Sequence, residues 1–237
     1  MTNIINENQD NKNNKDYRCE GKTCSAEISD KKLIIFDWDG TLVNSNEQCF
    51  EACKVIFDQC KIPLDEETFL EFDSNPQKNI LKDYGLEEYR PLYNEIFFGL
   101  CKQTHIPLKN HVKEVILRLR EKGKKIAIAT NGPADFVKDM VKSLEYDVLF
   151  DCIAGIDKDI KLKPAPDMLQ SVLENLKMKK TEAVYIGDAP RDIECAKNAG
   201  VVSIAFTAGS FGYKALKESN PDYIINDIRE IIINTVN

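Results

Sequence analysis

An apolar run at residues 33–36, LIIF, is followed at once by the polar sequence DWDGT at residues 37–41. An unbroken run of β-branched and aromatic residues predicts a strand that is buried on both faces of a parallel sheet. Because side chains two residues apart in a strand point the same way, Asp37 and Asp39 can face one pocket at the end of this strand. Two such carboxylates repel each other unless a cation or a shared proton lies between them. Gly40 then allows a tight turn, and turn formation alone is the competing interpretation.

The segment between Asn44 and Lys109 contains no strand pattern. Apolar residues spaced three and four apart predict helices instead. The expected helices cover residues 46–60, 66–72, 77–84 and 86–105. We therefore expect a separate small helical domain over residues 45–107.

From residue 110 onward, helix and strand patterns alternate. The expected helices cover residues 111–122, 133–145, 166–176, 191–199 and 228–234, and the expected strands cover 125–130, 149–154, 183–187, 201–206 and 223–225. Such alternation predicts an α/β fold, in which helices cover both faces of a parallel sheet and ligands bind at the carboxyl ends of the strands. Residues 31–44 and 108–237 would form this core.

Composition sets further limits. Residues 1–30 are rich in Asn, Asp, Glu and Lys, so we expect a disordered or loosely attached tail. A net charge of −7 argues against a nucleic-acid partner. No apolar run approaches the ~20 residues of a membrane helix, and the N-terminus lacks the apolar segment of a signal peptide. Eight cysteines in 237 residues are too few for a disulfide scaffold, which favours the reducing cytoplasm. Together these features lead us to expect a cytoplasmic protein without a membrane partner.

Three later strand ends also carry polar side chains. The sequence IATNG ends the second expected strand, where Thr130, Asn131 and free backbone N–H groups can bind phosphate oxygens. In KLKPAPD, Lys163 precedes two prolines at the start of a helix and can neutralise a carboxylate and a phosphoryl group together. By itself, however, Lys163 is more typical of an exposed surface lysine, and Lys161 is a rival for the same role.

The last of these strand ends is GDAPRD, where Asp188 follows a buried strand and Asp192 begins the next helix. A few carboxylates, completed by water and substrate phosphate, are the ligands that Mg²⁺ prefers. Asp192 can also simply complement the dipole at the N-terminus of its helix.

Together, FDWDGT, IATNG, KPAPD and GDAPRD occur in an order that resembles the haloacid dehalogenase superfamily of phosphohydrolases. The match extends over about residues 32–228, and it is most similar to the branch that includes phosphoglycolate-phosphatase-like enzymes. The resemblance implies a Rossmann-like parallel-sheet core with an inserted, mobile α-helical cap domain. It also implies a Mg²⁺-dependent phosphatase that hydrolyses a small phosphorylated metabolite.

The resemblance assigns a role to each motif. Asp37 would attack phosphorus and form an aspartyl-phosphate, and Asp39 would protonate the leaving group and then activate water. Thr130, Asn131 and Lys163 would bind the phosphoryl group. Asp37, the carbonyl of Asp39, Asp188 and Asp192 would hold Mg²⁺. The related dehalogenases lack an acid at the position that matches Asp39. Its presence here favours phosphate esters as substrates over organic halides.

Two positions depart from the commoner family pattern, since Asn44 replaces a frequent Asp and Ala189 a frequent Ser or Thr. Neither carries a role in the chemistry above. Three alternatives stay open: a sugar phosphomutase with the same intermediate, a phosphonate-cleaving enzyme that uses a cap lysine such as Lys54, and a non-enzymatic interaction module.

Overall fold

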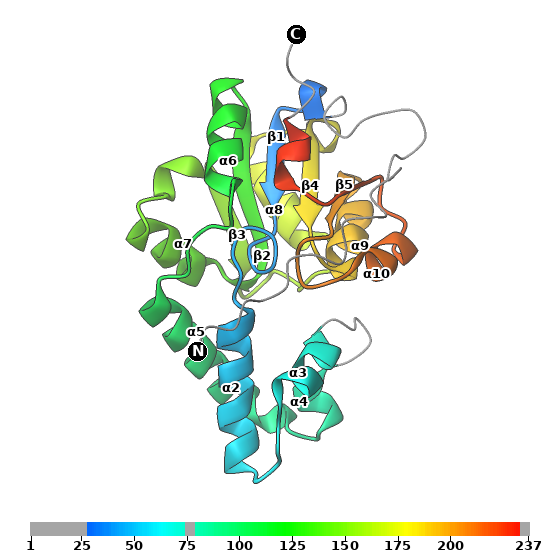
Figure 1. Ribbon diagram of the computed structural model, residues 1–237. Helices are drawn as coiled ribbons and strands as arrows, with labels where there is room; N and C mark the ends of the chain where they lie inside the picture. Colours follow the sequence, from blue (N-terminus) through cyan, green and yellow to red (C-terminus); the bar gives the residue numbers. More distant parts are fainter. Residues whose placement is uncertain (1–27, 74–78, 233–237) are drawn as a thin grey trace, which may run out of the picture.

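The computed structural model describes residues 28–73 and 79–232, which form a parallel sheet and a helical insert (Figure 1). The six strands are β1 (Leu33–Phe36), β2 (Lys125–Pro133), β3 (Cys152–Ile156), β4 (Ala183–Gly187), β5 (Val202–Phe206) and β6 (Tyr223–Ile225). Their order in the sheet is β3-β2-β1-β4-β5-β6, and every neighbouring pair is parallel. This arrangement confirms the predicted α/β, Rossmann-like class.

Strand β1 lies at the centre of the sheet, and its side chains divide the core into two layers. Ile34 and Phe36 pack on one face and Leu33 and Ile35 on the other, and none of the four is exposed. Helices α6 (Val112–Glu121) and α7 (Ala134–Ser143) and the 3-10 helix η4 (Ile228–Ile231) cover the first face. Helices α8 (Asp167–Leu176) and α9 (Pro190–Ala199) cover the second, and α10 (Tyr213–Glu218) packs beside α9. The alternation of side chains along one strand thus serves both layers.

A helical insert follows β1 and precedes β2. It consists of α2 (Asn46–Gln59), α3 (Glu66–Asp73), α4 (Ile80–Asp83), the 3-10 helix η1 (Glu87–Tyr89) and α5 (Arg90–Thr104). Helices α2 and α5 pack together, and Ile56, Phe57, Leu81 and Leu86 form a small core of its own. Figure 1 shows the insert projecting from the end of the sheet at which β1 leads into α2.

The two segments that connect the insert to the sheet lie side by side. Val43 and Leu108 form an isolated antiparallel bridge, and the backbone N–H of Lys109 donates to the carbonyl of Leu42 at 2.8 Å. The predicted cap, residues 45–107, begins and ends beside this bridge. Within the described ranges, the helices are too short or too polar to cross a membrane.

Several expected element boundaries were wrong. The helix expected over 86–105 is divided into η1 and α5, with Pro91 in the first turn of α5. The strand expected over 149–154 begins only at Cys152, because Leu149 buries its side chain from a 3-10 turn. Within the helix expected over 228–234, residues 228–231 form a 3-10 helix, and residues 233 and 234 lie outside the described residues. Helix α10 was missed, since its six residues contribute one buried side chain, Leu216, and show little periodicity.

Residues 1–27 of the expected tail lie outside the described residues, but Ile28 is fully buried. The ammonium of Lys124 donates to the carbonyl oxygens of Ile28, Ser29 and Lys31 at 2.9, 3.0 and 2.6 Å. Packing against the core therefore begins at Ile28, a few residues before residue 31, the start of the core that the sequence predicted.

Candidate active site

Asp37 comes directly after β1 and is 3% exposed. Its backbone N–H donates to the carbonyl of Ile186 on β4 at 2.9 Å, which continues the sheet pairing by one residue. Lys163 comes from the segment between β3 and α8, and its ammonium donates to Asp37 Oδ1 at 2.7 Å and to Asp192 Oδ1 at 2.6 Å. Because Lys163 is 4% exposed, it is a buried partner of two carboxylates and not a surface lysine. Lys161, its rival, is exposed.

Tyr185 on β4 completes the surroundings of this ammonium. Its hydroxyl accepts a hydrogen bond from Lys163 at 2.9 Å and lies 3.0 Å from both Asp192 Oδ1 and the carbonyl of Ala129. The backbone N–H of Ala189 donates to Asp192 Oδ2 at 3.0 Å. Asp192 therefore holds Lys163 in place as well as facing the other carboxylates.

Asp188, after β4, is held from two sides. The hydroxyl of Thr41 donates to its Oδ1 at 3.1 Å, and the backbone N–H of Ser210 donates to its Oδ2 at 2.6 Å. Gly40 has a positive φ of 78°, and a Cβ at this position would stand 2.0 Å from Asp188 Oδ2. Only glycine permits both this backbone conformation and this close approach.

The carboxylates of Asp37, Asp188 and Asp192 are buried and offer ligand atoms within 4.8 Å of one another. Burial and the nearby charge of Asp192 raise the pKa of Asp37 to about 8, although Lys163 opposes the shift. Burial also raises the pKa of Asp188. The pKa of Asp192 is lowered in spite of burial, because Lys163 and Arg191 stabilise its charge. Such a cluster carries more negative charge than its cations offset, and it fits a hard divalent metal ion.

Asp39 lies two residues after Asp37 and is not part of the three-carboxylate group. The hydroxyl of Ser45, at the start of α2, donates to Asp39 Oδ1 at 2.7 Å. Burial raises the pKa of Asp39, and the bond from Ser45 acts in the opposite direction. A raised pKa favours a carboxyl group that carries a proton to be donated, as a general acid does.

Thr130 and Asn131 lie in the C-terminal part of β2. The backbone N–H of Gly132 donates to the hydroxyl oxygen of Thr130 at 3.0 Å, and the backbone N–H of Lys163 donates to Asn131 Oδ1 at 2.8 Å. Asn131 therefore positions the segment that carries Lys163. The structure thus brings together all the site residues that the sequence predicted.

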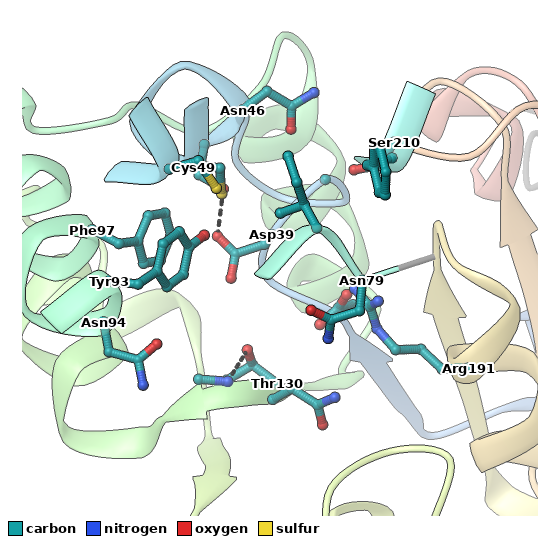
Figure 2. A pocket seen from close by; sticks show the side chains of 18 of the residues that line it. Asp39, Asn46, Cys49, Asn79, Tyr93, Asn94, Phe97, Thr130, Arg191 and Ser210 are labelled. Atoms are coloured by element: carbon teal, nitrogen blue, oxygen red, sulfur yellow. Dashed lines mark hydrogen bonds between the residues drawn. The ribbon is translucent and has the colours of Figure 1, made fainter. Parts of the chain in front are cut away.

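Asp37, Asp39, Thr130, Asn131 and Lys163 line a cavity of about 410 Å³ between the sheet and the insert. Asp188 and Asp192 lie beside it, in the carboxylate group that includes Asp37. In Figure 2, Asp39 and Thr130 point into it, with the rings of Tyr93 and Phe97 on one wall and Arg191 across from them. The insert contributes Ser45, Asn46, Cys49, Cys53, Phe69, Phe72, Asn79, Ile80, Arg90, Tyr93, Asn94, Phe97 and Phe98. Lys54 is exposed and does not line this cavity, which weighs against the phosphonate-cleaving alternative.

This architecture can be compared with known proteins. A family profile described as haloacid dehalogenase-like hydrolase matches residues 34–206. The chain belongs to this family. The resemblance inferred from the four motifs is therefore confirmed, and the protein is a haloacid dehalogenase-like hydrolase.

Relatives of this hydrolase include a protein of Caldanaerobacter subterraneus named as a candidate pyrophosphatase, PpaX, which is 30% identical over 207 residues, 84% of this chain and 92% of that protein. The phosphoglycolate phosphatase of Vibrio parahaemolyticus is 28% identical over 217 residues, 86% of this chain and 95% of that enzyme. A crystal structure described as a predicted phosphatase from Clostridium acetobutylicum superposes with a TM-score of 0.72 at 26% identity, over 85% of this chain and 96% of that one.

Some residues of the hydrolase site were not predicted from the sequence. Arg191 lines the cavity; desolvation lowers its pKa, but Asp192, Asp37 and Asp188 raise it by more. Arg191 and Tyr185 stand within the YIGDAPRD sequence, so their motif drew attention to them without indicating a role. Ser45 and Ser210 carried no such signal, because each meets its carboxylate only through the fold.

Proposed function

We propose that this hydrolase is a Mg²⁺-dependent phosphatase that acts on a small phosphorylated metabolite through an aspartyl-phosphate on Asp37. The observation that carries the proposal is the buried ammonium of Lys163, which joins Asp37 to Asp192 beside a third carboxylate. The names of relatives, a candidate pyrophosphatase and a phosphoglycolate phosphatase, support phosphoryl-transfer chemistry.

In the first step, an oxygen of the ionised Asp37 carboxylate, whose charge Lys163 stabilises, attacks phosphorus while the bond from phosphorus to the leaving oxygen breaks. Lys163 holds Oδ1 of Asp37, so Oδ2 is the oxygen that attacks. Asp39, whose pKa is raised, donates its proton to the leaving oxygen. The products are the alcohol and an acyl phosphate on Asp37.

In the second step, water attacks the same phosphorus and gives its proton to Asp39, which is now ionised. The bond between phosphorus and Asp37 breaks, inorganic phosphate leaves, and both aspartates return to their first states. The hydroxyl of Thr130 and the ammonium of Lys163 face the cavity and bind the equatorial phosphoryl oxygens.

Mg²⁺ would be held by Asp37, Asp188 and the carbonyl of Asp39, with Asp192 beside them, and when bound it would supply positive charge to the phosphoryl oxygens. The insert, residues 45–107, would act as a cap domain, because it supplies one wall of the cavity and hence excludes water from part of it.

The test is phosphate release from p-nitrophenyl phosphate and a panel of phosphorylated metabolites, with Mg²⁺ and with a chelator. Asp37→Asn should abolish turnover, and Asp39→Asn should lower it roughly 10²- to 10⁴-fold, the usual contribution of general acid–base catalysis. Asp58→Asn, on the exposed side of α2, is the matched control. Full activity of Asp37→Asn would overturn the nucleophile assignment. Phosphoryl transfer between two positions of a sugar, with little free phosphate, would identify a mutase instead.

A further inference from the structure

We infer that the preferred substrate carries a second anionic group, a carboxylate or a phosphate, on its leaving group, and that Arg90 of the insert binds this group. This inference rests on the proposed function and specifies its substrate class. It follows from the distribution of charge on the two walls of the cavity and from the contacts of Arg90.

Arg90 is the one cation that the described part of the insert presents to the cavity. The other described cations of the insert lie elsewhere. Lys54 is on the outer side of α2 with its ammonium 5.9 Å from the ring of Phe50, and Lys102 donates to Asp139 of α7 at 3.3 Å. Lys61 and Lys82 are exposed and do not line the cavity. Lys78 lies outside the described residues.

The described part of the insert also contributes no acidic side chain to the cavity wall. Its polar groups there, apart from Arg90, are neutral: the amides of Asn46, Asn79 and Asn94, the hydroxyls of Ser45 and Tyr93, and two thiols. A negative charge on the leaving group would therefore meet one cation and no like charge on this wall. A positively charged leaving group would meet repulsion from Arg90 without a compensating acid.

Neighbouring side chains hold Arg90 at the wall. Its Nη2 donates to Asn79 Oδ1 at 2.9 Å, and its guanidinium lies 5.6 Å from the centre of the Tyr93 ring. Both partners line the same cavity. Its Nε stands 3.5 Å from Glu87 Oε1, but the Glu87 side chain is 58% exposed, so this ion pair is weak. A guanidinium has five N–H donors, and the contacts that the described residues make leave Nη1 to bind an anion.

The cations of the sheet wall have different partners. Lys163 bonds to Asp37 and Asp192, and Arg191 has Asp37, Asp188 and Asp192 as its charged neighbours. These two cations therefore serve the carboxylate cluster and the transferred phosphoryl group. Arg90 is paired to no member of that cluster, so its charge is available to another part of the substrate.

The experiment compares matched esters that differ in the second charge. One pair is 2-phosphoglycolate and its neutral amide, and the other is 1,3-propanediol bisphosphate and its monophosphate. For the wild-type protein with Mg²⁺, kcat/KM should be higher for the more anionic member of at least one pair. The quantity compared is kcat/KM for the more anionic member of a pair divided by kcat/KM for the less anionic member. In Arg90→Met this ratio should fall roughly 10- to 100-fold, mainly through KM, because a charge-assisted hydrogen bond is lost. The pair with the larger fall identifies the second group as carboxylate or phosphate.

Two further variants make the result specific. Arg90→Lys keeps the charge but not the planar fork, and it should give an intermediate ratio. Lys82→Met removes one charge from the insert away from the cavity, and its ratio should equal that of the wild type. An unchanged ratio in Arg90→Met, or a wild-type preference for the less anionic member of both pairs, would overturn the inference. Mg²⁺-dependent hydrolysis of p-nitrophenyl phosphate would then still support the proposed function, whereas a wild-type protein that hydrolysed no ester would overturn both.

Discussion

Replacing Lys163 by Met would leave two buried carboxylates, those of Asp37 and Asp192, without the cation that joins them. The side chains of Lys163, Asp37 and Asp192 are 1%, 4% and 0% exposed, so water cannot take the place of the ammonium. Met keeps most of the volume of the lysine stem, and the variant therefore tests the charge more than the packing.

The expected cost follows from this burial. Removing one partner of a buried ion pair lowers the free energy of unfolding by about 3–5 kcal/mol, because the remaining charge stays desolvated. The loss of the hydrogen bond to Tyr185 belongs to the same change. For a domain of this size, each kcal/mol shifts the melting temperature by about 2–4 °C, so the expected decrease is about 6–20 °C.

The assay is urea denaturation in the presence of a chelator, for Lys163→Met, Asp192→Asn and the double variant. Because Asp192→Asn removes the carboxylate whose charge Lys163 stabilises, the double variant should be more stable than the sum of the single effects implies, with a coupling of about 1–3 kcal/mol. Lys161→Met, at an exposed position two residues earlier, should change stability by no more than about 0.5 kcal/mol. Additive effects, or a cost below about 1 kcal/mol for Lys163→Met, would refute this reasoning.

Two other substitutions test how the site is positioned. Gly40→Ala should displace Asp188, because the new Cβ would stand 2.0 Å from its Oδ2. Strain of this kind costs about 1–3 kcal/mol, and a loss of about 1.4 kcal/mol of transition-state stabilisation lowers the rate tenfold, so Mg²⁺-dependent turnover should fall about tenfold or more. Gly85→Ala has a similar φ of 70° but no neighbouring atom within 4 Å, so it should cost only about 1 kcal/mol of stability with unchanged turnover; equal losses of turnover in both variants would contradict this account. Ser45→Ala should slow hydrolysis of an alkyl phosphate more than that of p-nitrophenyl phosphate, because the aryl leaving group depends less on the proton of Asp39, and equal slowing would show that Ser45 does not act through Asp39.

Much of the core could be predicted because its patterns are local. Buried strands such as β1 and β4 show as apolar runs, and glycines or prolines mark where the neighbouring helices begin and end. The strand-end motifs were recognisable since parallel strands present their carboxyl ends on one edge of the sheet. Short elements were predicted less well, because α10 and η4 form too few turns to develop a period.

Lys163 illustrates the limit of the local pattern. Its own neighbours in the sequence favour an exposed lysine, yet it meets Asp37 from 126 residues away. The same holds for Ser210, which meets Asp188 from a distance of 22 residues, and for Arg90, which shares a cavity with the carboxylates. None of these pairings has a signature in the spacing of residues.

The sequence by itself determined the α/β class, the position of the helical insert and the residue types of the site, because hydrophobic period and strand-end chemistry are properties of short segments. The tertiary structure alone decided that Lys163 is buried between two carboxylates and that Arg90, of all the described insert cations, faces the cavity. The physical reason is that burial and electrostatic pairing depend on which distant segments meet, and that is set by the order of the strands and the packing of the insert.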